Sequence, residues 1–375
     1  MQLISGATVF APKCLGKRDV LVAGGKIEME GPFIPLPHGA EVIDARSLVM
    51  LPGFLDQHVH IIGGGGEGGF ATRAPEISAS QLVKAGISTV VGVLGTDGLT
   101  RNVENLVAKA KSLRATGLTA FATTGSYAMP SPTITGSVMK DIVFISEVIG
   151  VKIAVSDSRS SSPTGADLAW LGSEARLAGL LSGKAGILIM HMGDGKAGMA
   201  PLFDLIADTD IPVRVFRPTH VNRNLALCKE ALEFAKMGGM IDLNPDGELR
   251  TSEVLRMAEA QGVPLENITV SSDGQGSWTR YDEFGAVVEM GINSVGLLFR
   301  DFVGLLDDGF PVEDALPFFT SNVAKGLNLA NKGVITEGAD ADFLLVDEHW
   351  NIRHMFSQGK QLLKDGQVIL PTFGR

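Results

Sequence analysis

The chain has 375 residues, of which 45% are hydrophobic and 20% are charged, and its formal net charge at pH 7 is −10. This length supports one large α/β domain with an appended segment, or two domains, while the acidic balance argues against a nucleic-acid partner because phosphate binding requires a basic face. Two cysteines are too few for a disulfide framework or a thiolate metal cluster, and no apolar stretch suits a membrane span or a leader segment, so we expect a cytoplasmic protein without a membrane partner.

Short strands and turns are predicted for residues 1–52, where Gly and Pro interrupt apolar runs at close spacing. The same pattern returns in residues 331–375, whereas residues 53–330 alternate between apolar strand runs and helical periodicity. We therefore expect the two terminal segments to pair into one small β-sandwich domain that flanks a larger central domain.

Eight apolar strand segments are predicted in the central domain. The first ends in the histidine pair at 58 and 60, and the others span 88–95, 119–127, 151–158, 185–193, 212–221, 240–246 and 268–274. Helical segments are expected at 103–115, 167–181, 224–237, 252–261, 284–306 and 311–327. This βα alternation predicts a closed TIM-type (β/α)8 barrel. An open doubly wound sheet, the alternative, would need an early glycine-rich phosphate turn, and none is suitably placed.

His58 and His60 lie at the end of the first predicted barrel strand. Because side chains in a strand alternate faces with period two, both imidazoles point the same way. The glycine run at 63–66 lets the backbone pass close to a bound group. The pair by itself also fits two packed core histidines ahead of a flexible loop.

Three further residues with metal-binding side chains end other predicted strands: His191 ends the fifth, His220 the sixth and Asp273 the eighth. Active sites of such barrels lie at the carboxyl ends of the strands. Taken singly, these residues also fit a satisfied core histidine, a capped turn and a turn aspartate. Taken together with the histidine pair, they predict a site for Zn²⁺ or a similar divalent ion.

Lys152 lies in the middle of the fourth predicted strand, within the apolar run VIGVKIAV. Its side chain must either reach an edge or point into the barrel, where desolvation favours the neutral amine. A neutral amine can capture CO₂ as a carbamate. This product would supply an anionic bridge of two oxygens between two metal ions.

Several sequence motifs carry a family resemblance. The H-x-H after PGFLDQ, the strand lysine, the later histidines and aspartate, and the closing motif with Gly333, Gly338, Asp340, Asp342 and Asp347 resemble the amidohydrolase superfamily. More narrowly, DQHVHIIGGGGEGG, GSYAMPSPTITGS, IGVKIAVSDSRSS, HMGDGK, PTHVNRN and SSDGQGS resemble the isoaspartyl dipeptidase family. The resemblance covers essentially the whole chain. It implies a metallopeptidase that hydrolyses β-aspartyl dipeptides in a homo-oligomer, an octamer.

The resemblance also implies a metal centre and a mechanism. One zinc ion is expected on His58, His60 and Asp273 and a second on His191 and His220, with Lys152 bridging them as N6-carboxylysine. A hydroxide that bridges the metals is the expected nucleophile. Asp273 is then the expected general base and acid, and Tyr127 is expected to stabilise the oxyanion.

The substrate implied by the resemblance carries one ammonium and two carboxylates, so its site needs one anion and two cations. Glu67 suits the ammonium, and Arg159 and Arg223 suit the carboxylates because a guanidinium matches carboxylate geometry. The expected further contacts are Gly65, Thr96 and Ser277. A solvated loop for Glu67, or structural ion pairs for the arginines, are the alternatives. The segment 135–141 after Tyr127 is expected to be a mobile loop.

Two other functions remain open. The first keeps the metal centre but acts on a cyclic amide or an N-acyl amino acid. The second is a non-catalytic binding or assembly protein built on a metal-free barrel. A panel of substrates separates the first from a dipeptidase, and metal analysis separates the second.

Overall fold

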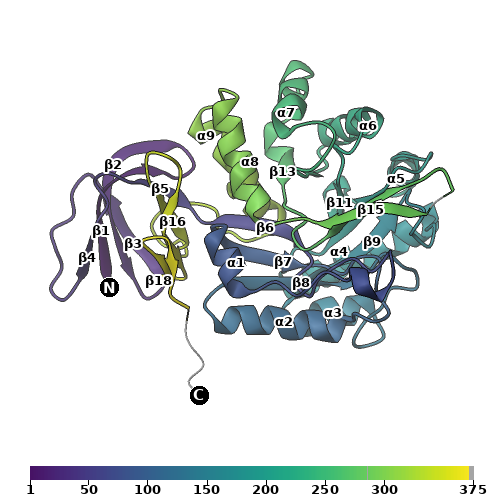
Figure 1. The fold of residues 1–375 in the computed structure, drawn as a ribbon, viewed down its shortest axis with the longest axis horizontal. Helices are drawn as coiled ribbons and strands as arrows, with labels where there is room; N and C mark the ends of the chain where they lie inside the picture. Colours follow the sequence, from purple (N-terminus) through teal and green to yellow (C-terminus); the bar gives the residue numbers. More distant parts are fainter. Residues whose placement is uncertain (285, 371–375) are drawn as a thin grey trace.

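Two large sheets lie side by side in the computed structural model, which describes residues 1–284 and 286–370 (Figure 1). One sheet joins both ends of the chain, and the other is formed by the middle of the chain. Figure 1 shows the strands of the C-terminal segment against those of the N-terminal segment, on the side of the molecule away from helices α4 and α5.

The terminal sheet has the strand order β19-β18-β17-β16-β5-β1-β2-β3, with β4 paired to β1. Its strands are β1 (Gln2–Phe10), β2 (Cys14–Ala23), β3 (Lys26–Gly31), β4 (Glu41–Asp44), β5 (Val49–Pro52), β16 (Phe343–Val346), β17 (Ile352–Ser357), β18 (Lys360–Lys364) and β19 (Gln367–Val368). The two ends of the chain join where β5 and β16 pair antiparallel, with Leu51 opposite Leu344. Phe343 and Phe356 stack at 4.4 Å between ring centroids in the core of this sheet.

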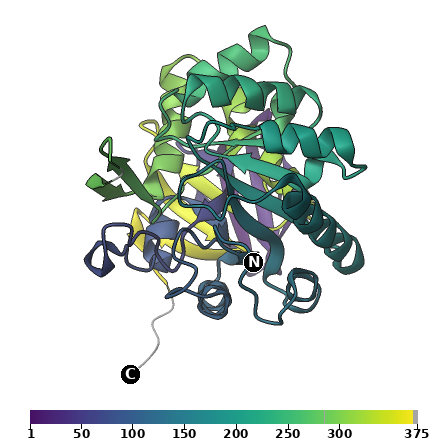
Figure 2. The same ribbon diagram turned by 90° about the vertical axis from the view of Figure 1, so that its right-hand side faces the viewer.

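The barrel sheet follows chain order from β6 to β13. Its strands are β6 (Phe54–Val59), β7 (Ile87–Gly92), β8 (Thr119–Gly125), β9 (Val148–Val155), β10 (Ile187–Met192), β11 (Phe216–Thr219), β12 (Ile241–Leu243) and β13 (Ile268–Val270). Neighbouring strands are parallel. A parallel bridge between Val59 and Gly274 brings the first and last strands together, and Figure 2 views this sheet from the right-hand side of Figure 1. The expected TIM-type barrel with a β-sandwich of both termini is confirmed.

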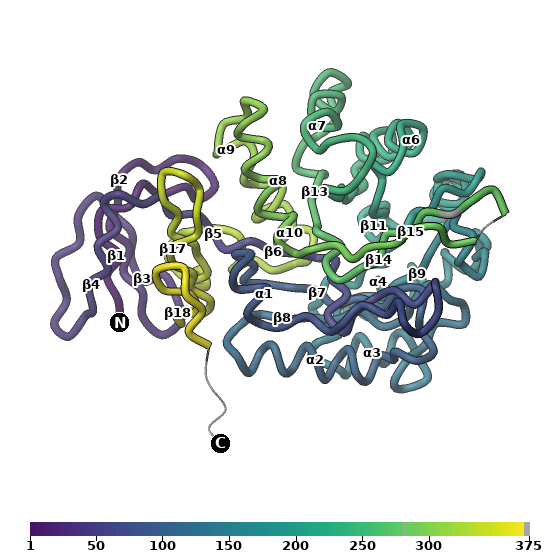
Figure 3. The backbone as a smooth tube through the Cα atoms, in the orientation of Figure 1, coloured from purple at the N-terminus to yellow at the C-terminus, as the bar shows by residue number. Residues whose placement is uncertain are grey.

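Helices connect the barrel strands and cover their outer face (Figure 3). They are α1 (Ala79–Lys84), α2 (Val103–Ala115), α3 (Val138–Phe144), α4 (Gly165–Ser182), α5 (Ala200–Asp208), α6 (Leu225–Lys236), α7 (Thr251–Ala260), α8 (Gly296–Asp307), α9 (Val312–Ala315) and α10 (Ser321–Gly326), with 3-10 turns at Phe70–Thr72, Val213–Val215, Leu265–Asn267 and Leu316–Phe319. Side-chain caps fix several starts; Asn102, for example, accepts a hydrogen bond from the backbone N–H of Asn105 at the start of α2. Among the described residues, no helix has both the length and the hydropathy needed to cross a membrane.

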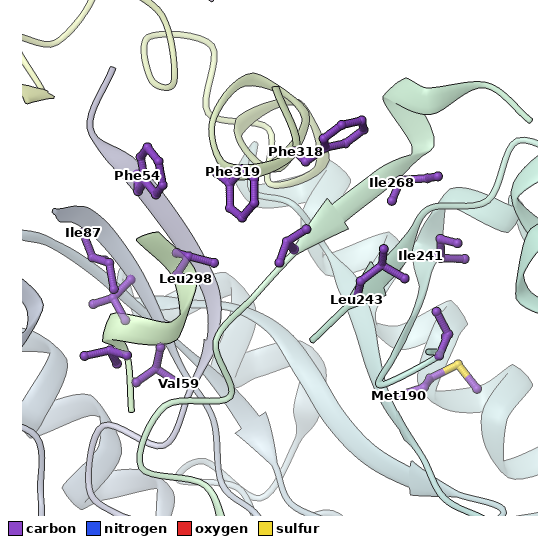
Figure 4. Packing of buried hydrophobic residues seen from close by; sticks show 14 of the residues in the cluster. Phe54, Val59, Ile87, Met190, Ile241, Leu243, Ile268, Leu298, Phe318 and Phe319 are labelled. Carbon is purple, nitrogen blue, oxygen red and sulfur yellow. The ribbon is translucent and has the colours of Figure 1, made fainter. Parts of the chain in front are cut away.

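The outward side chains of the strands pack against the helices. Figure 4 shows part of this layer, in which Met190 and Leu243 come from barrel strands and Leu298 comes from α8. The ring of Phe54 lies 5.3 to 5.5 Å from three phenylalanine rings, those of Phe299, Phe302 and Phe319. Burying such aromatic area stabilises the contact between the barrel and its last helices.

The inward side chains change character along the barrel axis. On β10, Leu188, Met190 and Met192 join the outer layer, whereas Ile187 and Ile189 belong to a separate buried cluster inside the barrel. We call this cluster the barrel plug; it consists of Leu55, Val91, Val93, Ile149, Ile187, Ile189, Val323, Ala324 and Leu327. His191 is the next inward residue of β10, which sets the plug directly below the predicted metal site.

Three predicted segments differ from the structure. Residues 284–306 were expected to be one helix, but Ser277–Tyr281 and Val287–Ile292 form an antiparallel hairpin, β14–β15, and only Gly296–Asp307 is helical; residue 285 lies outside the described residues. Asp282 explains the turn, because its side chain accepts hydrogen bonds from the N–H groups of Phe284 and Ala286.

The helix expected at 311–327 breaks into α9, a 3-10 turn and α10, since Pro317 lacks the N–H that a continuous helix needs. The segment 135–141 is not an irregular loop throughout. Ser137 caps α3, and the buried Asp141 accepts hydrogen bonds from the backbone N–H groups of Ile134 and Thr135.

Candidate active site

The six predicted metal ligands meet at the carboxyl end of the barrel. His58 belongs to β6, Lys152 to β9 and His191 to β10, while His60, His220 and Asp273 follow directly or within three residues after β6, β11 and β13. All six are buried. Nζ of Lys152 lies 2.9 Å from Nε2 of His58, and Oδ1 of Asp273 lies 3.2 Å from Nε2 of His60. The rings of His191 and His220 are 4.5 Å apart between centroids.

Two of these residues, His220 and Asp273, have a backbone conformation that residues other than glycine rarely adopt. The φ angle is 61° at His220 and 51° at Asp273, in the left-handed region. Each such residue costs about 1–3 kcal/mol and persists only where surrounding contacts fix it. Here the N–H of His220 donates to Oδ1 of Asn244 at 3.1 Å, and the carbonyl oxygen of Asp273 accepts from the N–H of Gly276 at 2.9 Å. The direction of these two side chains is therefore maintained at a cost in folding free energy.

Several buried side-chain atoms of the cluster lack a hydrogen-bond partner among the described residues: Nδ1 of His58, Nδ1 of His60, Nε2 of His220 and Oδ1 of Asp273. An unsatisfied buried polar atom costs about 1–3 kcal/mol. His58, His220 and Asp273 each offer a ligand atom within 4.8 Å of the others. Imidazole nitrogen and carboxylate oxygen are donors that suit zinc, so the residues present fit a metal ion.

Burial also favours the protonation states that metal binding requires. It lowers the pKa values of His58, His191 and His220 well below their usual value, which keeps the imidazoles neutral. Burial lowers the pKa of Lys152 to about 7. The amine of Lys152 is thus neutral in a substantial fraction of molecules near neutral pH, the form that can react with CO₂.

A cavity of about 490 Å³ opens above this cluster. His60, His191, His220 and Asp273 form part of its wall, and so do all of the predicted substrate contacts and the predicted oxyanion group: Gly65, Glu67, Thr96, Tyr127, Arg159, Arg223 and Ser277. The sequence-predicted site residues are therefore brought together around one space, with His58 and Lys152 below it.

Glu67 is held by hydroxyl groups on the cavity wall. Its carboxylate accepts hydrogen bonds from Oγ1 of Thr96 at 3.0 Å and Oγ of Ser277 at 3.0 Å. Nη1 of Arg159 is 3.5 Å from the same carboxylate. Arg223 also lines the cavity, and its Nη1 pairs with Asp194 at 3.1 Å. Glu67, Arg159 and Arg223 thus line a common space. Its wall also includes five further carboxylates, those of Asp157, Asp194, Asp246, Glu248 and Asp273.

Tyr127 is buried beside the histidine cluster. Its hydroxyl lies 2.6 Å from Nδ1 of His191, and its ring centroid lies 4.5 Å from that of His191. Burial raises the pKa of Tyr127 above its usual value. The phenol therefore stays protonated and can donate a hydrogen bond into the cavity.

Two residues that contact predicted site residues, Asp157 and Asn293, were not predicted from the sequence. Asp157 contacts both Arg159 and His191, and an aspartate near the end of the fourth predicted strand is the signal that could have identified it. Asn293 is buried and its Nδ2 lies 2.7 Å from Oδ2 of Asp246 and 3.4 Å from Oδ2 of Asp273. It follows the β14–β15 hairpin, which the sequence pattern did not predict.

Comparison with known proteins identifies similar families and folds. A model of the amidohydrolase family matches residues 219–370. The solved β-aspartyl dipeptidase of Fervidobacterium islandicum AW-1 in complex with a β-Asp-Leu dipeptide is 45% identical to this chain, with a TM-score of 0.95 and coverage of 100% of this chain and 98% of that one. A D-hydantoinase is similar in fold alone, at 17% identity and a TM-score of 0.71 over 98% of this chain and 96% of that one.

Curated relatives are more distant. An adenine deaminase of Deinococcus radiodurans is 26% identical over 98% of this chain, and a dihydroorotase of Staphylococcus aureus is 31% identical over 30% of it. The matches span 63% of the deaminase and 26% of the dihydroorotase, which is less than two thirds of either relative.

Proposed function

Because the chain belongs to the amidohydrolase family and, within it, to the β-aspartyl dipeptidases, we propose that it hydrolyses the isopeptide bond of β-aspartyl dipeptides. It is a metal-dependent hydrolase. The observation that carries the choice of substrate is the charge pattern of the cavity, in which Glu67 lies among hydroxyl donors while Arg159 and Arg223 face the same space.

This charge pattern matches a β-aspartyl dipeptide group by group. The α-ammonium of the substrate pairs with Glu67, and its two carboxylates pair with the guanidinium groups of Arg159 and Arg223. In the free enzyme Arg159 pairs with Asp157 and Arg223 pairs with Asp194. A guanidinium has five N–H donors, so each arginine can also bind a substrate carboxylate. A neutral cyclic amide carries no ammonium for Glu67 and no carboxylates for the arginines, so it gains none of these charged contacts.

The proposed metal centre consists of two zinc ions. His58, His60 and Asp273 would hold one, His191 and His220 the other, and Lys152, carboxylated on Nζ, would join them. When bound, the ions lower the pKa of water and polarise the scissile carbonyl. The neutral imidazoles and the low pKa of the Lys152 amine support this ligand set.

Asp273 and Tyr127 supply the proton transfers and hydrogen bonds of the reaction. Asp273, at the cavity wall, takes the proton of the nucleophile and returns it to the leaving amine. Tyr127, protonated because of its burial, donates to the carbonyl oxygen as negative charge develops there. Gly65, Thr96 and Ser277 keep Glu67 and the ammonium-bearing half of the substrate in place.

Steady-state kinetics on the purified full chain, with zinc counted per chain, test the proposal. Rates are measured with β-Asp-Leu, α-Asp-Leu, hydantoin and N-acetylleucine. We expect hydrolysis of β-Asp-Leu at least about 10²-fold faster than of the others, since hydantoin and N-acetylleucine lack the ammonium and α-Asp-Leu carries the same three charges in a different arrangement around the scissile bond. Equal rates for the two linkages, preference for hydantoin or N-acetylleucine, or protein free of bound metal would overturn it.

A further inference from the structure

The carboxylate of Asp157 lies between a proposed metal ligand and a proposed substrate-binding arginine. Its side chain is 5% exposed. Oδ1 accepts hydrogen bonds from the backbone N–H and from Nε of Arg159, at 2.8 and 2.9 Å. Oδ2 lies 2.7 Å from Nη2 of Arg159 and 2.9 Å from Nε2 of His191. Each oxygen therefore has two donors: both oxygens contact Arg159, and Oδ2 also contacts His191.

Building on the function proposed above, we propose that Asp157 is a positioning residue that fixes the tautomer of His191 for metal binding and the orientation of Arg159 for substrate binding. A carboxylate accepts hydrogen bonds but does not donate them. Contact with Oδ2 of Asp157 therefore places the imidazole proton on Nε2 and leaves the lone pair on Nδ1.

The other side of the imidazole agrees with this tautomer. Nδ1 of His191 lies 2.6 Å from the hydroxyl of Tyr127, a protonated phenol that can donate to a bare ring nitrogen. Nη2 of Arg159 is also 3.3 Å from Nε2 of His191, but this is longer than the 2.9 Å contact with Asp157. When Nε2 of His191 is protonated, it and Nη2 of Arg159 are both donors and cannot bond to each other. Oδ2 of Asp157 accepts a hydrogen bond from each of them.

The backbone around Asp157 holds the carboxylate in place. A Cβ atom added at Gly193, two residues after His191, would lie 2.4 Å from Cβ of Asp157, and one added at Gly195 would lie 2.5 Å from the carbonyl oxygen of Ser156. The N–H of Gly195 donates to that oxygen at 2.6 Å. The loop after His191 therefore packs directly against Ser156 and Asp157, which fixes the carboxylate relative to the imidazole.

The bidentate pair with Asp157 also aligns the guanidinium of Arg159. Nε and Nη2 point to the carboxylate, so Nη1 is directed to the cavity side, where it approaches Glu67 at 3.5 Å. A guanidinium fixed on one edge loses less freedom when its other edge binds a substrate carboxylate. Asp157 thus links the proposed metal ligand, His191, to the proposed substrate contact, Arg159.

Histidine NMR on the unmodified, metal-free full chain tests the tautomer. With ¹⁵N-labelled histidine, and the His191 signals assigned by comparison with His191→Asn, we expect a proton on Nε2 and none on Nδ1. A proton on Nδ1 would overturn the proposal. This measurement needs neither activity nor bound zinc, so it remains decisive if the proposed function fails.

Asp157→Asn tests the consequence. The amide keeps the shape of the side chain but presents NH₂ to His191, which favours the wrong tautomer. We expect about 10–100-fold weaker binding of the second zinc ion, together with a higher KM for β-Asp-Leu. Arg159→Gln separates the effect on substrate binding from the effect on metal binding: the KM of this variant for β-Asp-Leu should rise, while its zinc content should stay at the wild-type level.

Asp194→Asn is the matched control, because Asp194 lines the same cavity and pairs with an arginine, Arg223, and with Asn224. Its zinc affinity should equal that of the wild type. Wild-type zinc affinity and KM in Asp157→Asn would refute the positioning role. Absence of zinc or of β-Asp-Leu hydrolysis in the wild type would instead refute the proposed function.

Discussion

The two ends of the barrel interior are built from the same strands but follow different physical rules. At the amino end, the barrel plug is apolar, and α10 contributes Val323 and Ala324 to it. At the carboxyl end, three buried histidines and an aspartate have polar atoms without a hydrogen-bond partner among the described residues, and His220 and Asp273 have left-handed backbone conformations. Burial of the plug stabilises the folded barrel, whereas the strained and unsatisfied residues at the carboxyl end lower its stability but form a site that can bind a ligand.

β10 shows this difference within six residues. Ile187, Ile189 and His191 all point inward, yet the first two belong to the plug and the third to the ligand cluster. Substitutions at the two ends should therefore affect different properties, and the predictions below are ordered by the size of the expected effect.

Lys152→Ala should have the largest effect. Nζ of Lys152 lies 2.9 Å from Nε2 of His58, and its loss removes the proposed bridge and weakens binding of both metals. We expect zinc content to fall and turnover of β-Asp-Leu to drop by about 10³-fold or more. Zinc analysis and steady-state rates measure this.

Lys184→Ala is the control for that experiment, because Lys184 donates to the carbonyl oxygens of Ile142, Ile145 and Val148 at the amino end of β9. It should lose stability but keep its zinc. Normal zinc and turnover in Lys152→Ala would contradict the bridging role.

Tyr127→Phe should lower turnover by about 10²–10³-fold, because one hydrogen-bond donor to the developing oxyanion is lost. The ring remains, so packing beside His191 is preserved. KM and zinc content should change little. Rates measured over a range of β-Asp-Leu concentrations separate kcat from KM, and an unchanged kcat would remove Tyr127 from the mechanism.

Removal of zinc by a chelator should destabilise the protein as well as inactivate it. Ligand binding to the folded state alone adds about 2.7 kcal/mol at a free zinc concentration of 100 times Kd. Thermal unfolding with and without zinc measures this difference. A melting temperature independent of zinc would mean that the unsatisfied atoms of the cluster do not bind it in solution.

Ile189→Val should have the smallest effect, since it removes one methyl group from the plug, where Ile189 is 2% exposed. We expect a loss of about 0.5–1.5 kcal/mol in the free energy of unfolding. Zinc content, kcat and KM should equal those of the wild type. Denaturant unfolding measures the stability change, and a change in zinc affinity would show that the two ends are coupled.

The barrel and most of its helices could be predicted because strand and helix periodicities there agree with tertiary packing. The helix predicted at 103–115 corresponds to α2 (Val103–Ala115), and the predicted ligand residues lie together because they are at or near the carboxyl ends of the strands. The β14–β15 hairpin was missed because its turn depends on one aspartate side chain, Asp282. Asp157 was missed because its partners His191 and Arg159 come together only after folding.

The first and last strands meet at very few places. Beside the bridge between Val59 and Gly274, the N–H of His60 donates to the carbonyl oxygen of Gly274 at 2.8 Å, and the N–H of Ser272 donates to Asp56 at 3.2 Å. This seam lies among His58, His60 and Asp273, so the barrel closes at the end that carries the proposed active site. Breaking these contacts would expose amide protons of β6 and β13. It would also separate His58 and His60 from Asp273, which is more than two hundred positions away in the sequence. The stability of the barrel and its proposed activity thus depend on the same few backbone contacts.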